Sequence, residues 1–411
     1  MIQGKAFDIP KSLVWKSYHS VRRNRGAPGV DGQTLTQFDV DRDRNLYKIW
    51  NRMVSGSYFP PPVLAKSIAK SDGGERVLGI PTVADRIAQG AVKLYMEEIL
   101  DPIFHVDSYG YRPGKSAHQA LEKCSQNCFT RNWVLEVDIK SFFDTVRHDL
   151  VIQTLNHHKM PRWVVLYCQR WLEAPMAVSR DDQSCHARVV GTPQGGVISP
   201  LLANLFLHYA FDMWMVRERN TIPFERYADD IVCHCATMKE ATQLHDKLVR
   251  RFAEVGLTLS ESKTAVVYID TFTRYNVKTC FTFLGFDFKV RTLRNFKGEL
   301  FRKCMPGAAM KAMKKIARTI RDWRIHRSVA SIEELSRRFN ATIRGWINYY
   351  DKFWYRTFAH RLYTLLQSRL LKWAKARYRV GNRRAIRKLE LIRGDNPRLF
   401  AHWYMLRASD A

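Results

Sequence analysis

Residues 133–140 alternate between apolar and polar positions. Val137 and Ile139 fall on one face of this segment, and Glu136 and Asp138 fall on the other. A period of two is that of a strand with one buried face. The pattern therefore predicts a half-buried strand that carries Asp138 near its end, on the polar face.

An N-terminal β-hairpin is predicted from two short apolar runs. Val63–Ala69 and Arg76–Ile80 flank the loop 71–74, whose two glycines favour a turn. Lys70 and Arg76 would lie beside that turn.

Strands and helices are expected to alternate through the first three hundred residues. Phe224–Cys235 is predicted to form two short strands around Asp229 and Asp230. Helices are predicted at Ser12–Arg23, Asp85–Leu100 and, after the glycine-rich loop 191–196, Ser199–Val216. The alternation is typical of an α+β protein.

From about Val290 the pattern changes to basic helices. They are predicted at Gly307–Arg327, Ser331–Tyr350, Phe358–Arg377 and Arg383–Ile392. In the second of them Ile343, Trp346, Ile347 and Tyr350 recur at helical spacing, followed by Trp354, and are expected to be buried. The cations Arg337, Arg338 and Arg344 are expected to stay exposed. The change of pattern near 301–306 predicts a domain boundary.

Basic residues outnumber acidic ones by a wide margin. The 411 residues hold 67 Lys and Arg against 39 Asp and Glu, a formal net charge of +28. From Lys311 onward there are 25 basic and 7 acidic residues, so most of the excess lies in the last quarter. Such a field attracts a polyanion, which makes nucleic acid the first partner to consider. A basic surface that only keeps the protein soluble is the alternative interpretation.

Eight cysteines are scattered along the chain, at positions 124, 128, 168, 185, 233, 235, 280 and 304. No secretory signal is recognised at the N-terminus, so they are interpreted as reduced thiols of a cytoplasmic protein. Cys124 with Cys128, and Cys233-His234-Cys235, are candidate metal ligands. Neither group has a second ligand pair at zinc spacing, which favours buried free thiols.

Asp138, Asp229 and Asp230 are the candidate catalytic residues. Nucleotidyl transfer uses two divalent cations about 4 Å apart, one activating the attacking 3′-hydroxyl and one binding the triphosphate. Carboxylates on a rigid scaffold suit Mg²⁺, which leaves its other positions to water and phosphate. Taken singly, a strand-end Asp or an Asp pair in a turn is more often turn or capping chemistry.

A catalytic role is favoured over turn or capping chemistry once several motifs are considered in their order along the chain. They are Asp138-Ile139-Lys140-Ser141-Phe142-Phe143-Asp144, Gly191-Thr192-Pro193-Gln194-Gly195-Gly196-Val197-Ile198-Ser199-Pro200, Tyr227-Ala228-Asp229-Asp230, Gly256-Leu257-Thr258-Leu259-Ser260-Glu261-Ser262-Lys263-Thr264 and Phe283-Leu284-Gly285-Phe286. In this order they resemble the palm motifs of reverse transcriptases, most closely those encoded by group II introns. Residues 23–32, 79–86 and 108–114 look like the family's N-terminal extension and fingers, and 344–350 is similar to its maturase, or thumb, domain.

The resemblance implies a right-hand polymerase fold of α+β class, with fingers and a palm of antiparallel sheet and helices before an α-helical thumb/maturase domain. The expected domains are an N-terminal extension and fingers at 1–130, a palm interleaved with fingers at 131–295, and a basic helical domain at 300–411.

Carried over by position, the resemblance makes Asp138, Asp229 and Asp230 the ligands of two Mg²⁺ ions, or of Mn²⁺ in their place. The Ile139 carbonyl is a further implied contact. Lys263 is a candidate proton donor to the leaving group, with a structural lysine as the alternative.

Four side chains are implied to contact the incoming nucleotide. Phe143 matches the aromatic residue that packs under the deoxyribose and excludes a 2′-hydroxyl, and its alternative is a core phenylalanine. Gln194 matches a glutamine that touches the nucleotide. Lys70 and Arg76 match the triphosphate ligands, although Ala69 stands where a proline commonly precedes the lysine. Solvated surface charges are the alternative for both.

The implied function is an RNA-directed DNA polymerase that uses an RNA template, a DNA primer and dNTPs. It would also bind group II intron RNA as a maturase that assists splicing and retromobility, and it resembles the short type without an H-N-H endonuclease region. The expected location is the cytoplasm, in association with the nucleoid or with a ribonucleoprotein. No association with a membrane is expected. Two alternatives stay open: a domesticated relative in phage defence or repair, and a splicing-only RNA-binding maturase, which the three intact aspartates disfavour.

Overall fold

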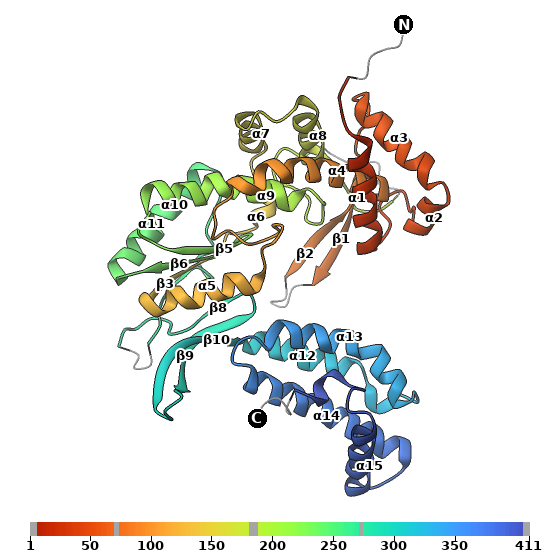
Figure 1. The fold of residues 1–411 in the computed structure, drawn as a ribbon. Helices are drawn as coiled ribbons and strands as arrows, with labels where there is room; N and C mark the ends of the chain where they lie inside the picture. Colours follow the sequence, from red (N-terminus) through yellow and green to blue (C-terminus); the bar gives the residue numbers. More distant parts are fainter. Residues whose placement is uncertain (1–5, 70–73, 181–187, 271–273, 406–411) are drawn as a thin grey trace. The chain divides into compact units, whose positions relative to one another are not determined.

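The computed structural model describes residues 6–69, 74–180, 188–270 and 274–405 (Figure 1). The chain divides into two compact units. The first comprises residues 1–116, 136–233 and 239–265, and the second comprises 117–135, 234–238 and 266–411. Helices and largely antiparallel sheets occur in both, so the predicted α+β class is confirmed.

The first unit begins with the helices α1 (Lys11–Asn24), α2 (Leu35–Val40) and α3 (Arg42–Val54), and α4 (Val83–Leu100) follows after two strands. α1 packs against α4, where the Ser17 hydroxyl donates to the carbonyl oxygen of Ile87 at 2.8 Å (Figure 1). Gly90 permits this approach, because a Cβ there would meet Ser17 Oγ at 2.1 Å. The predicted helices 12–23 and 85–100 are confirmed to within two residues.

A three-stranded sheet contains the predicted N-terminal hairpin. β1 (Val63–Ala69) pairs antiparallel with β2 (Glu75–Ile80), and β4 (Met176–Ala177) pairs with β1 in parallel. Arg76 lies opposite Ile68, next to the Ala69–Glu75 pair that precedes the connecting loop. Lys70 lies outside the described residues.

A second sheet has the strand order β5-β6-β3-β7. Its strands are β3 (Trp133–Val137), β5 (Phe224–Tyr227), β6 (Asp230–Cys235) and β7 (Ala265–Tyr268). The predicted strand at 133–140 is confirmed but ends at Val137, so Asp138 follows it. The face that carries Glu136 and Asp138 is mixed, because Val134 falls on the same face and is fully buried.

The predicted single helix at 199–216 is interrupted. It consists of α9 (Ser199–Leu207), the π-helical turn η2 (His208–Asp212) and α10 (Met213–Glu218). Such turns insert an extra residue and are frequent at functional sites. The other helices of this part of the chain are η1 (Asp101–Ile103), α6 (Phe142–Thr145), α7 (His148–His157), α8 (Arg162–Glu173) and α11 (Met238–Glu254).

The second unit combines a helix, a sheet and a helical bundle (Figure 1). Its first elements are α5 (Ala117–Thr130) and the antiparallel strands β8 (Phe281–Phe283), β9 (Phe286–Arg294) and β10 (Leu300–Ala308). The bundle contains α12 (Met310–Asp322), η3 (Ile325–Arg327), α13 (Ile332–Tyr350), α14 (Tyr355–Tyr378), α15 (Asn382–Asp395) and η4 (Ala401–Trp403). The four predicted basic helices are therefore present, but the first, predicted at 307–327, is divided into α12 and η3, and residues 301–308 lie within β10.

The bundle has its own apolar core, which includes Phe339, Leu362 and Trp373. In α13, Ile343 is buried in that core. The side chains of Trp346, Ile347 and Tyr350 are partly buried and pack against it. Arg337, Arg338 and Arg344 are exposed, as predicted. Among the described residues, no helix combines the length and the apolar character needed to span a membrane.

Candidate active site

The hairpin of β5 and β6 positions two of the candidate catalytic aspartates. Tyr227 lies opposite Asp230, so Ala228 and Asp229 form the connecting loop. Ala228 has φ +57°, a left-handed conformation that costs an L-residue about 1 kcal/mol or more. The tight turn leaves Asp229 at its tip and makes Asp230 the first residue of β6.

Asp138 is held by the segment that follows α11. Its carbonyl oxygen accepts from the Ser260 backbone N–H at 2.8 Å, and its own N–H donates to Thr264 Oγ1 at 3.3 Å. Lys263 Nζ lies 3.6 Å from Asp138 Oδ2. Lys263 thus places a positive charge beside Asp138, one of the three candidate carboxylates.

The carboxylates influence one another. Burial and then the charge of Asp138 raise the pKa of Asp229. Asp230 retains an exposed edge, yet desolvation by the surrounding protein, followed by the charges of Asp229 and Asp138, raises its pKa to about 7. Mutual repulsion of this kind means that the three side chains share one small region of the first unit.

This donor set fits divalent cations. Hard carboxylate oxygens are the ligands that Mg²⁺ prefers, and a divalent ion would relieve the repulsion among Asp138, Asp229 and Asp230. Ile139 forms an antiparallel bridge with Leu259, and the flanking backbone hydrogen bonds belong to the neighbouring residues. In that arrangement the Ile139 carbonyl points away from its bridge partner. The Ile139 carbonyl oxygen therefore accepts no hydrogen bond from Leu259.

The hairpin that carries Asp229 and Asp230 contains a buried arginine, Arg226 of β5. Arg226 Nη1 donates to the Ala228 carbonyl oxygen at 3.2 Å and to Asn204 Oδ1 at 2.9 Å. Its Nε donates to Asp212 Oδ1 at 2.7 Å, and its Nη2 pairs with the other Asp212 oxygen. Both side chains are fully buried. Burial alone would raise the pKa of Asp212, but the Arg226 guanidinium holds it below its ordinary value.

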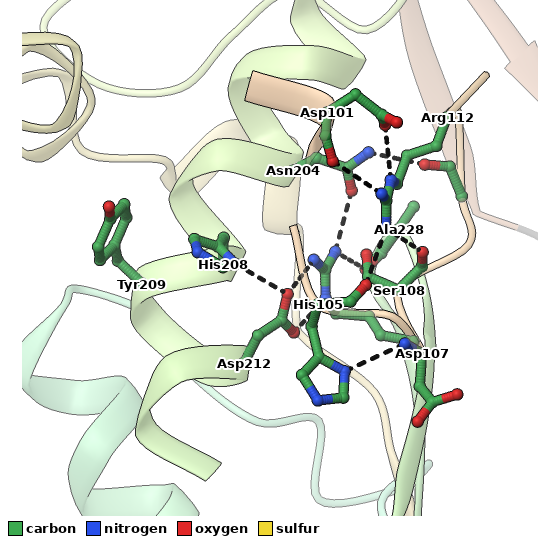
Figure 2. Close-up of polar contacts among 12 residues, drawn as sticks. Asp101, His105, Asp107, Ser108, Arg112, Asn204, His208, Tyr209, Asp212 and Ala228 are labelled. Atoms are coloured by element: carbon green, nitrogen blue, oxygen red, sulfur yellow. Dashed lines mark hydrogen bonds and ion pairs between the residues drawn. The ribbon is translucent and has the colours of Figure 1, made fainter. Parts of the chain in front are cut away.

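The same network includes the chain segment beside β5. Asn204 Nδ2 donates to the Gly110 carbonyl oxygen at 2.7 Å, and a Cβ at Gly110 would meet the Ala228 nitrogen at 2.4 Å. Arg112 donates to the carbonyl oxygens of His105 and Ser108, each at 2.8 Å (Figure 2). The backbone of the hairpin is thus packed on one side against residues 105–112.

Sequence reasoning missed this support. Arg226 stands next to the Tyr-Ala-Asp-Asp motif but outside it, and Asp212 lies within the otherwise apolar sequence of the predicted helix 199–216. A charged residue within an apolar helix was the available signal, because such a charge is rarely buried without a partner.

The loop 191–196 brings Gln194 to the N-terminal hairpin. The Gly79 N–H donates to the Gln194 carbonyl oxygen at 2.6 Å, and Arg76 Nε donates to the Gln194 side-chain oxygen. Gly195 has φ +116°, and a Cβ there would meet the Gly79 carbonyl oxygen at 2.4 Å. Arg76 also acts electrostatically on Asp229. Two residues predicted to bind the nucleotide therefore contact each other close to the carboxylates.

Phe143 adjoins this loop through its backbone. The Thr192 N–H donates to the Phe143 carbonyl oxygen at 2.7 Å. The Phe143 side chain is 8% exposed and Phe142 is 2% exposed, so Phe142 is the more deeply buried of the two. Phe142 also packs on Phe206, at 6.3 Å between ring centroids.

The end of the same loop is capped by α4. Gln89 Oε1 accepts from the N–H groups of Val197 and Ile198, at 2.7 and 3.3 Å. Gln89 Nε2 donates to Asp85 Oδ2 at 2.9 Å. Desolvation raises the pKa of the fully buried Asp85 to about 6. Hydrogen bonds from Trp171 and its other donors lower this pKa but do not offset the desolvation.

Comparison with known proteins gives two family matches. Residues 68–288, more than half of the chain, match the family described as reverse transcriptase (RNA-dependent DNA polymerase). Residues 313–390 match the group II intron, maturase-specific domain.

Individual relatives cover part of the chain. The group II intron-encoded protein LtrA of Lactococcus lactis subsp. cremoris is 30% identical over 258 residues, 62% of this chain and 41% of LtrA. Protein YkfC of Escherichia coli (strain K12) is 37% identical over 196 residues, 46% of this chain and 50% of YkfC. The aligned part of the chain thus spans half the length of these relatives or less. A solved telomerase from Candida albicans, in complex with a TWJ fragment of telomeric RNA, aligns with a TM-score of 0.45 and 13% identity over 78% of this chain and 61% of that one.

Proposed function

Because this chain belongs to the reverse transcriptase family, we propose that it is an RNA-directed DNA polymerase that extends a DNA primer along an RNA template. One observation carries the proposal. Arg76 donates a hydrogen bond to Gln194, and its positive charge lowers the pKa of Asp229. The negative charge of Asp138 raises the same pKa. Side chains expected to contact the nucleotide and side chains expected to bind metal ions therefore converge in one compact unit.

In this proposal Asp138, Asp229 and Asp230, with the Ile139 carbonyl, hold two divalent cations, Mg²⁺ or Mn²⁺. Such ions, when bound, lower the pKa of the primer 3′-hydroxyl and neutralise charge on the leaving pyrophosphate. The protein supplies rigid ligands, through the tight turn of β5 and β6 and the anchored end of β3. Lys263 balances the charge of Asp138.

The incoming dNTP would lie against the N-terminal hairpin and the loop 191–196. Arg76, with Lys70, offers positive charge to the triphosphate. Gln194 would contact the nucleotide, and Phe143 would exclude a 2′-hydroxyl below the sugar. The glycines of the loop let its backbone approach a ligand closely.

The helical bundle supports a second role, as a maturase that binds group II intron RNA. Its match to the maturase-specific domain covers residues 313–390, and α13 exposes Arg337, Arg338 and Arg344 on the side away from its core. Cations on a folded scaffold bind an RNA backbone chiefly through its phosphates. We assign residues 1–130 to an N-terminal extension and fingers, 131–295 to a palm interleaved with fingers, and 300–411 to this thumb/maturase domain.

A primer-extension assay tests the polymerase role. The full chain is incubated with an oligo(dT) primer on poly(rA), dTTP and Mg²⁺, and products are resolved by length. We expect extension that stops when EDTA is added. No extension with either Mg²⁺ or Mn²⁺ would overturn the proposal.

A splicing assay tests the maturase role separately. A group II intron precursor RNA from the host genome is incubated at low Mg²⁺, with and without the full chain. We expect the protein to accelerate splicing. Binding without acceleration would restrict the chain to polymerase chemistry and so favour a domesticated enzyme.

A further inference from the structure

Four side chains that the active site does not use converge in the second unit. Cys124 and Cys128 lie one helical turn apart on α5, so they share a face. His234 comes from β6 and Cys304 from β10. All four are buried, with exposed fractions between 0% and 5%.

Their ligand atoms lie close together. The sulfurs of Cys124 and Cys128 and a ring nitrogen of His234 are all within 4.8 Å of one another. Cys128 Sγ is 3.9 Å from His234 Nδ1, and it also hydrogen-bonds the thiol of Cys304. Cys128 is thus in direct contact with both of the strand residues.

The group of Cys124, Cys128 and His234 fits three corners of a tetrahedral metal site, and Cys304, which contacts Cys128, is the candidate for the fourth. With Zn–S bonds of about 2.3 Å and Zn–N bonds of about 2.0 Å, neighbouring ligand atoms lie about 3.5–3.8 Å apart. The 3.9 Å between Cys128 and His234 is close to that edge length. Three sulfurs and one imidazole are a common structural zinc set, and four protein ligands leave no open position for a substrate.

The surroundings suit the charge of such a centre. Three thiolates, one neutral imidazole and Zn²⁺ carry a net charge of about −1. Arg291 acts electrostatically on Cys304, and its Nε donates to the carbonyl oxygen of the next residue, Met305, at 3.1 Å. Cys168 offers a contrast: it is equally buried but contacts the sulfur of Met96 at 3.7 Å, as a core thiol does.

We propose that Cys124, Cys128, His234 and Cys304 bind a structural zinc ion that fastens α5 to β6 and β10. The three thiols release their protons on binding, as zinc–thiolate bonds require. In this proposal Cys124 and Cys128 are metal ligands and not the buried free thiols that the sequence favoured. The second pair of ligands is absent from the local sequence because it comes from two strands far along the chain.

The test uses the full chain, purified without chelators from zinc-supplemented cells. We expect about one zinc per chain by elemental analysis, and its removal to lower the unfolding temperature by about 5 °C or more. Cys128→Ser should lose the metal, whereas the matched control Cys168→Ser should keep it. Full zinc occupancy in Cys128→Ser would overturn the assignment.

A cobalt titration keeps the proposal testable if Cys128→Ser fails to fold. One equivalent of Co²⁺ added to the metal-free wild-type chain should give the absorption of tetrahedral cobalt with thiolate charge-transfer bands. Zinc should then displace the cobalt and abolish these bands. Their absence at one equivalent, together with zinc far below one per purified chain, would contradict the proposal.

Discussion

Arg226 donates a hydrogen bond to the carbonyl oxygen of Ala228, 3.2 Å away, across the turn that presents Asp229. Ala228 has a left-handed backbone conformation, with φ +57°. Such strain persists only when the surrounding structure over-determines it. Arg226, itself fixed by Asp212 and Asn204, supplies that constraint. We infer that it is a positioning residue for the turn that carries the proposed catalytic residue Asp229.

The first prediction separates positioning from stability. Arg226→Met leaves the buried Asp212 without its guanidinium partner and with only His208 beside it, and should cost about 3–5 kcal/mol of unfolding free energy. The double variant Arg226→Met with Asp212→Leu removes both charges and should recover most of that loss. Its kcat for primer extension should remain about 10- to 100-fold low, because the turn is no longer held. Wild-type kcat in a stable double variant would show that Arg226 has only a structural role.

The second prediction concerns the pH dependence of stability. The pKa of Asp85 is about 6 in the folded chain, against an ordinary 3.8, so the fold favours the protonated form. Its contribution is therefore fully present below about pH 4 and is lost as pH rises to about 6, by about 3 kcal/mol in total. Asp85→Asn removes this titration. Urea unfolding from pH 4 to 8 should show wild type losing stability relative to the variant over that window. Parallel curves would contradict the assignment.

The third prediction tests the loop that carries Gln194. Gly195→Ala places a Cβ 2.4 Å from the Gly79 carbonyl oxygen, so the loop must move. We expect a stability loss of about 1–3 kcal/mol and a KM for dNTP raised about tenfold or more. Gly298→Ala is the matched control, since it shares a positive φ but has no atom within 4 Å of the added Cβ. It should leave KM unchanged. An equal rise in both variants would remove the link to Gln194.

The fourth prediction concerns RNA binding by the bundle. Replacing Arg337, Arg338 and Arg344 with Gln should weaken RNA binding for all sequences. It should also reduce the slope of log K against log salt by about 2, because each lost phosphate contact contributes about 0.7–0.9. Neutralising three exposed cations of α11, Lys239, Lys247 and Arg250, is the charge-matched control. An equal loss of slope in the control would mean that only net charge matters.

Local patterns predicted much of the fold. Alternation located β3, and the apolar runs on either side of Asp229-Asp230 located β5 and β6. Helical spacing placed α13 and its exposed arginines correctly. These elements were predictable because each buries a single face, which leaves a simple period in the sequence.

Long-range contacts were not predictable in this way. The π-helical turn that contains Asp212 has no period of its own, and the pairing of Asp212 with Arg226 joins two elements through buried charges. From sequence, both residues are expected at the surface. The convergence of Cys128 with His234 likewise depends on the packing of α5 and β6, not on any local spacing.

Primer extension by Asp229→Asn tests the central claim most directly. Asp246→Asn serves as the control, because Asp246 is an exposed aspartate on α11. With an RNA template, a DNA primer, dNTPs and Mg²⁺, we expect wild type and Asp246→Asn to extend at similar rates. Asp229→Asn should lose at least about 100-fold in kcat, since a proposed metal ligand is removed. Extension by Asp229→Asn at the wild-type rate would contradict the proposed active site.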